Sequence, residues 1–214
     1  MNLELDHFFI LVEAEARVAD ILVSMGMQEG AQNIHKGQGT SNRRFYFSNM
    51  MLEFLWVHDE DEATNGPARE LRFLERSNNL LASPFGLIMH RKDDSSLVMP
   101  FAGWDYQPDY LEPPKAFHIG SNSINLLEPL CIYVPFIGPK MASEKTDDGE
   151  FSTISKIQVY TPVETLSDVL KITGSADRLN ITHGPEHLIE LTFDNQKKGY
   201  TRDLRPDIPL IINW

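Results

Sequence analysis

The sequence predicts an α+β fold in which two similar strand–helix–strand units flank a longer central segment. Short runs of aromatic and β-branched residues, bounded by glycines and polar residues, predict several strands. An amphipathic helical pattern follows the first of these runs, and the same order of patterns returns near the C-terminus. A chain with many strand signals and few helical ones is typical of the α+β class.

The first unit covers residues 1–57. Residues 5–12 form a short apolar run that predicts a buried strand. Residues 43–47 and 50–57 predict two further strands, and the two polar residues between them suit a tight hairpin. One helix face is predicted between the first strand and this hairpin by apolar residues at spacing i, i+3, i+4 and i+7: Val18, Ile21, Leu22 and Met25.

The second unit covers residues 154–214 and includes a C-terminal tail. Residues 154–160 alternate apolar and polar side chains, as a half-buried strand does. Thr161-Pro162-Val163-Glu164 has the pattern of a capping box and predicts the start of a helix. Residues 179–182 and 187–194 then predict two strands.

The two units can be superposed on their strand patterns. Residues 5–10 align with 154–159, and residues 51–55 align with 188–192. This alignment places His7 over Lys156 and Glu53 over Glu190. Each unit therefore has a polar residue early in its first strand and a glutamate in the middle of its last.

The central segment, residues 58–153, contains further strand signals at 84–90 and 130–134. Residues 100–118 are rich in proline and aromatic residues and predict an ordered loop packed by rings. How these strands pair with the two units stays open. At 214 residues, the chain is expected to form one structural domain overall.

Composition excludes several classes of function. The chain has 19 Lys and Arg against 31 Asp and Glu, a net charge of −12, whereas nucleic-acid binding needs a basic surface. No apolar run approaches the length of a membrane span, and the first residues lack the pattern of a secretory signal. The single cysteine, Cys131, excludes an intrachain disulfide framework and is expected to be a buried small hydrophobe. We therefore expect a cytoplasmic protein that binds neither nucleic acid nor membrane.

Two glutamates are the first candidates for a functional site. Glu53 lies between Leu52 and Phe54 in an otherwise apolar strand, where a charged residue is rarely buried without a partner. A functional role is favoured over the alternative, an edge strand that simply faces water, and Glu190 is the same case. His7 is either a ligand or general base, or a strand histidine bonded to backbone.

The order of these motifs resembles the vicinal oxygen chelate superfamily, which includes glyoxalase I, extradiol dioxygenases and bleomycin-resistance proteins. The resemblance is closest to the glyoxalase-like domain branch. It is carried by Leu5-Asp6-His7, the glycine-bearing stretch 35–42, Leu52-Glu53 and the stretch 188–194. It implies two βαβββ modules, residues 1–57 and 154–214, that form a curled mixed-sheet cup with an inserted central segment.

The resemblance also implies a divalent metal site, for Zn, Ni, Mn or Fe, at the positions of His7, Glu53, Lys156 and Glu190. His7, Glu53 and Glu190 carry donor atoms that ligate such metals, but a lysine ammonium has no free lone pair. Two carboxylates that face one low-dielectric cup need a cation between them. A metal ion is one such cation, and Lys156 paired with Glu190, Glu53 or both is the other.

The function implied is binding of a small organic molecule in the cup. If the protein is an enzyme, the resemblance implies a metal-dependent lyase, isomerase or dioxygenase, with Glu53 and Glu190 as catalytic carboxylates and Lys156 as the residue that orients them. Arg44, Trp104 and His90 are the candidate substrate contacts. Two alternatives stay open: a metal-free protein that binds or sequesters its ligand without turnover, and a cup filled by its own side chains. Assembly as a homodimer is left open.

Overall fold

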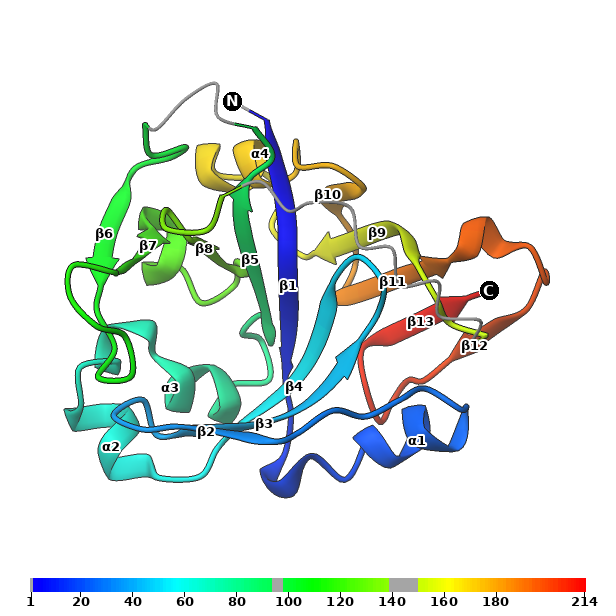
Figure 1. Ribbon diagram of the computed structural model, residues 1–214, viewed down its shortest axis with the longest axis horizontal. Helices are drawn as coiled ribbons and strands as arrows, with labels where there is room; N and C mark the ends of the chain where they lie inside the picture. The colour runs from blue at the N-terminus through cyan, green and yellow to red at the C-terminus, as the bar shows by residue number, and fades with distance from the viewer. Residues whose placement is uncertain (1, 94–97, 139–149) are drawn as a thin grey trace.

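The computed structural model describes residues 2–93, 98–138 and 150–214, and in these ranges the strands form two curled mixed sheets (Figure 1). The first sheet has eight strands in the order β2-β3-β4-β1-β5-β8-β7-β6. Their bounds are β1 (Leu3–Leu11), β2 (Asn33–His35), β3 (Thr40–Tyr46), β4 (Met51–Val57), β5 (Phe85–Arg91), β6 (Gly103–Tyr106), β7 (Phe117–Gly120) and β8 (Leu130–Tyr133). The expected α+β class with curled mixed sheets is confirmed.

The second sheet has five strands in the order β10-β9-β11-β13-β12. Their bounds are β9 (Ile154–Thr161), β10 (Leu179–His183), β11 (Leu188–Phe193), β12 (Thr201–Asp203) and β13 (Leu210–Asn213). The helices are short: α1 (Ala19–Ser24), α2 (Glu60–Asn65), α3 (Phe73–Asn78) and α4 (Asp168–Thr173), with single 3-10 turns at Ala14–Ala16, Arg69–Leu71, Ser121–Ile124 and Asp194–Gln196. Of the helices in the described ranges, none is both long and apolar enough to cross a membrane.

The pairing of the central segment, which the sequence left open, is visible in the first sheet. Strand β1 lies parallel to β4 and β5 lies parallel to β8, while β1 and β5 meet antiparallel in the middle. The sheet therefore consists of two halves with the same strand order, β2-β3-β4-β1 and β6-β7-β8-β5. The central segment supplies the second half, and residues 154–214 form a sheet of their own.

The second sheet repeats the inner strands of the first. Strand β9 lies parallel to β10 and antiparallel to β11, and β11 lies parallel to β13. This is the arrangement of β1 with β4, β5 and β8. The alignment of β9 with β1 is consistent with this, but β11 corresponds to β5 and not to β4. The expected equivalence of Glu190 with Glu53 is therefore wrong.

The backs of the two sheets share one apolar core. Side chains that alternate along the strands, among them Phe8 and Phe54 of the first sheet and Ile157 and Leu191 of the second, are buried together in it. Helix α1 contributes Leu22, and α4 contributes Val169 and Leu170. Because successive strand residues point to opposite faces, the other face of each sheet is turned away from this core.

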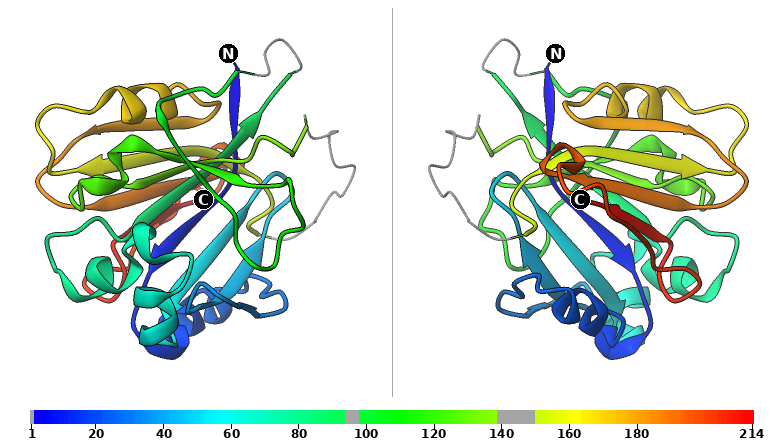
Figure 2. Two further views of the ribbon diagram at one scale, coloured as in Figure 1. Left: turned by 90° about the vertical axis from the view of Figure 1, so that its left-hand side faces the viewer. Right: turned by 90° about the vertical axis from the view of Figure 1, so that its right-hand side faces the viewer.

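The outer face of the eight-stranded sheet carries the α2–α3 segment, which lies opposite the second sheet in Figure 1 and toward the viewer in the left view of Figure 2. We call this face the cup. A second apolar cluster fills one end of it, where Phe73 of α3 packs edge-on against Phe9 at 6.0 Å between ring centroids. The other members from the strands and the nearby turn include Leu11, Leu55, Leu71, Ile88, Tyr106 and Ile132. The chain's own side chains thus occupy the apolar end of the cup.

Helix α4 begins later than the sequence pattern predicts. Thr161 still pairs with His183 in the sheet, so the expected capping box at 161–164 does not form. The helix is capped instead by Ser167, whose Oγ accepts from the Leu170 backbone N–H at 3.2 Å and donates to the buried Glu128 carboxylate at 2.7 Å. This hydroxyl therefore links the second sheet's helix to the loop before β8.

Replacing Ser167 by alanine is expected to lower the free energy of unfolding by about 1–2 kcal/mol, because both the helix cap and a donor to Glu128 are lost. Urea denaturation of the full-length variant measures this. Ser175→Ala is the matched control, since the exposed Ser175 hydroxyl donates to the Ile172 carbonyl and to no other group of the described residues. An equal, small effect of both substitutions would contradict the assignment.

Candidate functional site

The polar end of the cup brings together side chains from three adjacent strands. Glu53 of β4 lies opposite Arg44 of β3 and beside Phe9 of β1. Asn42 lies two residues from Arg44 on the same face of β3. Asp6 and His7 come from β1. Arg43 and Arg44 point to opposite faces because they are adjacent on a strand. Arg44 is on the cup face, whereas Arg43 binds Glu29 and Asp20 on the other face.

Glu53 is the most deeply buried acid of this group, with 7% of its surface exposed. Asn42 donates to its Oε1 at 3.0 Å, and the Asn42 side chain is itself held by the Asn33 backbone N–H, which donates to Asn42 Oδ1 at 2.9 Å. Burial raises the pKa of the Glu53 carboxyl, and the charges of His7 and Arg44 oppose this only in part. In the described part of the chain, Oε2 has no hydrogen-bond donor, so it is free to meet a ligand.

A β-bulge places Asp6 and His7 on the same face. The register of β1 against β5 shifts between Leu5 and His7. As a result Leu5 and Phe8 both face the shared core, and the two residues between them face the cup. Asp6 Oδ2 lies 2.5 Å from His7 Nδ1, so Asp6 fixes the orientation of the imidazole and leaves Nε2 turned away from it.

Arg44 supplies the fixed positive charge of the site. Its Nε donates to the Ala31 carbonyl at 2.7 Å, and its guanidinium lies 5.6 Å from the centre of the Tyr46 ring. Its charge lowers the pKa of both Glu53 and His35. Arg44 is therefore held in place at one side of Glu53 by the backbone and a ring rather than by a carboxylate.

A rim of hydrogen-bonded side chains closes the polar end. Tyr106 and Tyr110 both donate to Gln38 Oε1, at 3.4 and 3.3 Å, and Gln38 donates to Thr40 at 2.8 Å. The His35 ring lies 5.7 Å from the Tyr110 ring. Although Tyr110 is 44% exposed overall, burial of its hydroxyl and the charge of Glu53 both raise its pKa, so it remains a proton donor.

Sequence reasoning missed this rim. His35 and Gln38 are in the glycine-bearing stretch 35–42, and Tyr110 is in the aromatic stretch 100–118, so both segments were visible as motifs. The signal that singles out these residues is their pairing across 70 or so residues of chain, which no local pattern encodes.

His35 provides a pH test of the site. Burial, and then the charge of Arg44, lowers its pKa to about 4 from 6.5. The unfolded chain thus binds this proton more readily between these values, so the His35 contribution to stability is lost as pH falls from 6.5 toward 4. We expect the His35 ring signal to titrate near 4 by NMR.

In the His35→Gln variant, the free energy of unfolding should fall less steeply than in the wild type as the pH is lowered from 6.5 toward 4. His183, on the exposed end of β10, is the reference imidazole in the same spectra. A His35 midpoint near 6.5 would contradict the buried placement.

The predicted convergence of Glu53 and Glu190 is wrong. Glu190 alternates with Ile189 and Leu191, which face the shared core, so it lies on the outer face of the second sheet. There it accepts from the Tyr160 hydroxyl at 3.5 Å. The two carboxylates therefore point away from the core on opposite sides, because the strands that carry them pair into different sheets.

Lys156 does not join the two glutamates either. It is exposed on β9, on the same outer face as Glu190, and forms no ion pair with Glu53 or Glu190, all three being described residues. The predicted bridge from Lys156 to the two carboxylates is therefore wrong. Arg44 is the cation that faces Glu53.

His90 and Trp104, the other predicted substrate contacts, lie away from Glu53. His90 is fully buried on β5, with Nδ1 2.8 Å from the Arg91 carbonyl and Nε2 4.0 Å from Glu4. Trp104 donates from Nε1 to Ser123 and packs edge-on against Tyr106, at the apolar end of the cup. Their contact with a ligand stays a prediction.

The side chains present do not fit the divalent metal site that the resemblance implies. His7 and Glu53 share the cup, but the third donor, Glu190, is on the other sheet. At the level of His7, the second half of the eight-stranded sheet presents Ile88 on β5 and Ile132 on β8. Among residues 2–93, 98–138 and 150–214 there is no group of three His, Cys, Asp or Glu side chains that could hold a metal ion.

Comparison with known proteins relates this chain to others by fold. No family model and no curated protein matches it. A hypothetical protein from Staphylococcus aureus has a similar structure, with a TM-score of 0.56 and 13% identity over 99% of both chains. That likeness shows the same fold over the whole length.

Two enzymes of known name are more loosely similar. A variant of 4-hydroxymandelate synthase from Streptomyces coelicolor has a TM-score of 0.48 and 12% identity over 99% of this chain and 62% of that one. Methylmalonyl-CoA epimerase from Mycobacterium tuberculosis has a TM-score of 0.37 and 13% identity over 61% of this chain and 86% of that one.

Proposed function

We propose that the cup binds a small organic molecule with oxygens on adjacent carbons, and that Glu53 exchanges a proton with it as a general base. The reaction we propose is of the kind that the isomerases and lyases of the vicinal oxygen chelate superfamily carry out. The observation that carries the proposal is the Glu53 carboxyl itself: nearly buried, raised in pKa, fixed by Asn42 at one oxygen and open at the other.

A raised pKa suits a carboxyl to proton transfer. A general base works best when its pKa is close to the working pH, and burial is the usual means of raising a glutamate toward that range. Asn42 holds the Oε1 atom, so the lone pairs of Oε2 have a defined direction. Glu53 can therefore accept a proton from a carbon next to a carbonyl and return it.

The neighbours of Glu53 support the charge that such a transfer creates. Removal of a proton beside a carbonyl leaves negative charge on the carbonyl oxygen, which hydrogen-bond donors and cations stabilise. Arg44 supplies a fixed positive charge on one side. His7, oriented by Asp6, supplies an imidazole that can give or take a second proton.

The proposal uses the chain's own residues alone, since the donor set does not fit a metal. In this reading Arg44 and His7 fill the role that a Lewis acid has in metal-dependent relatives. The substrate class is a small hydroxy-carbonyl or dicarbonyl compound.

Hydrogen exchange tests this directly. Full-length protein is incubated in D₂O with a panel of small 2-hydroxy and 2-oxo carbonyl compounds, and loss of the carbon-bound proton signal is followed by NMR. We expect exchange of at least one class, abolished in Glu53→Gln and retained in Glu190→Gln. Exchange that persists equally in both variants would overturn the proposal.

A second candidate function is binding without turnover. The aromatic rings of His35 and Tyr110 at the polar end of the cup favour it, because ring surface can hold a ligand without acting on it. It predicts a ligand that raises the unfolding temperature and undergoes no hydrogen exchange. At 100 times its Kd, the ligand should add about 2.7 kcal/mol to the free energy of unfolding.

A further inference from the structure

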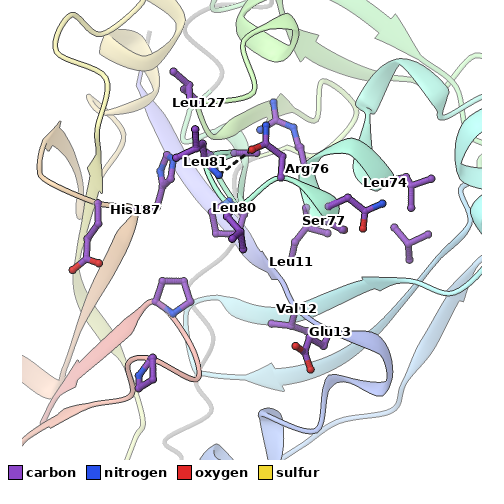
Figure 3. A pocket seen from close by; sticks show the side chains of 18 of the residues that line it. Leu11, Val12, Glu13, Leu74, Arg76, Ser77, Leu80, Leu81, Leu127 and His187 are labelled. Carbon is purple, nitrogen blue, oxygen red and sulfur yellow. Dashed lines mark hydrogen bonds between the residues drawn. The ribbon is translucent and has the colours of Figure 1, made fainter.

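A second hollow, of about 1150 Å³, lies away from the polar end of the cup. It is bounded by the end of β1, the end of α3, the turn between β10 and β11, and the loop before β13. Figure 3 shows Leu80, Leu81 and His187 on one side of it and Val12 and Glu13 on the other. None of the residues of the proposed proton-transfer site lines it.

The rim of this groove exposes two adjacent leucines. Leu80 is 101% exposed, Leu81 is 72% exposed and Leu127, which also lines the groove, is 41% exposed. The buried Leu11 and the half-buried Leu74 line it as well. Single exposed apolar residues are ordinary, but an exposed pair continuous with an apolar groove marks an interaction site.

The leucine pair is held in place. His187 contacts the Leu81 carbonyl through Nε2 at 3.2 Å, which ties the segment after α3 to the turn before β11. Arg76 of α3 donates to the carbonyls of Ser83 and Glu128, which fixes the other end of the same segment. The groove is therefore a built surface rather than a loose loop.

The charged side chains of the groove are acidic. Glu13, Glu60 and Asp207 line it and form no ion pair with any described residue, while Glu186 is paired with Arg205. Arg76 is buried and its donors are turned to backbone carbonyls. Burial lowers the pKa of His187, so that ring is neutral near pH 7. The groove thus has an apolar floor and an uncompensated negative edge.

We infer that this groove docks a basic amphipathic helix of a partner protein. Such a helix presents an apolar stripe flanked by lysines and arginines, which matches an apolar groove with acidic residues at its edge. A small ligand on the floor would leave Leu80 and Leu81 in water, whereas a helix laid along the groove covers them. A second copy of this chain is disfavoured, because it has a net charge of −12 and would bring like charges together.

The probe is a labelled synthetic peptide with leucines at i, i+3, i+4 and i+7 and lysines on both flanks of that stripe. Fluorescence anisotropy with the full-length protein measures its binding. We expect saturable binding that weakens at least about tenfold in the double variant Leu80→Asp, Leu81→Asp. Glu13→Lys with Asp207→Lys should weaken it about threefold or more at low salt, and the difference should shrink as salt is raised.

Two controls make the outcome decisive. Ile34→Asp removes an exposed apolar side chain on β2, outside the groove, and should leave peptide binding unchanged. A peptide with glutamates in place of the lysines should bind at least about tenfold more weakly. Absence of binding, equal binding of both peptides, or binding unaffected by the leucine double variant overturns the inference.

Discussion

Glu53→Gln should lower the rate of hydrogen exchange in the cup by a factor of about 10²–10⁴, the contribution typical of a positioned general base. The glutamine keeps the size of the side chain and can still meet Asn42, but it cannot accept the substrate proton. Rate constants measured with the compound that exchanges fastest, at saturating concentration, give the comparison. Glu190→Gln, on the other sheet, is the matched control and should exchange at the wild-type rate.

Glu53→Gln should lower the exchange rate but raise the stability of the protein near neutral pH. Since burial raises the folded-state pKa of Glu53 above 4.5, the folded protein binds this proton more tightly than the unfolded chain. The contribution of Glu53 to stability is therefore fully present at pH values below its pKa in the unfolded chain. It is lost as the pH rises through its pKa in the folded protein. Glu53→Gln should be more stable than wild type near neutral pH, and this advantage should vanish below 4.5.

Urea denaturation at a series of pH values measures this. A general base is charged and buried at a cost, so replacing it by a neutral amide should stabilise the folded protein. A loss of both activity and stability at neutral pH would therefore mean that Glu53 is a structural residue. A gain of stability with loss of exchange is the combination that the proposed function requires.

Arg76→Met should have the largest effect on stability, a loss of about 3–5 kcal/mol in the free energy of unfolding. Arg76 is only 3% exposed, and its guanidinium donates to the backbone carbonyls of Ser123, Ser83, Leu126, Asn125 and Glu128. These bonds join α3 to the loop before β8. Methionine fills the space of the side chain but leaves buried carbonyls without donors.

The control for this prediction is Arg69→Met. Arg69 belongs to the turn before α3 and pairs with Glu70 at the surface, so its loss should change stability by about 0.5 kcal/mol or less. Arg76→Lys, which keeps the charge but not the planar fork of donors, should fall between the two. Equal midpoints in urea for Arg69→Met and Arg76→Met would rule out the role given to Arg76.

Local sequence patterns predicted the elements that position the site. The run at residues 5–12 is β1, and the run at 50–57 is β4, within one or two residues at most of their ends. Glu53 stood out because it interrupts the apolar series of β4, and the structure places it on the cup face. These predictions held because alternation along a strand depends on which face is buried, and that is written in the residues themselves.

The pairing of strands from distant parts of the chain could not be read in the same way. Lys156 and Glu190 looked like counterparts of His7 and Glu53, yet the second sheet lacks the strands that would make the repeat complete. The central segment supplies the second half of the cup instead. The apolar runs of its strands β5 and β8 predict strands, but they do not show which sheet these strands join. Long-range order of this kind is set by packing of whole layers, which short patterns do not determine.

One feature of the site was present in the sequence as a break in alternation. Leu3 and Leu5 face the shared core, and so do Phe8 and Ile10. Two residues, Asp6 and His7, therefore stand between the two series where strict alternation allows one. Such a break predicts a bulge. It identifies the Asp6–His7 pair as residues turned together toward the cup.

The most direct test of the central claim, that the cup of the eight-stranded sheet holds the ligand, uses one side-chain amide on each sheet as a reporter. Asn42 bonds Glu53 in the cup, and Gln158 bonds Thr182 and Asn180 on the outer face of the second sheet. NMR spectra recorded during titration with an exchanging compound should show the Asn42 amide shifting to saturation while the Gln158 amide stays in place. A shift confined to Gln158 would contradict the account and move the site to the second sheet.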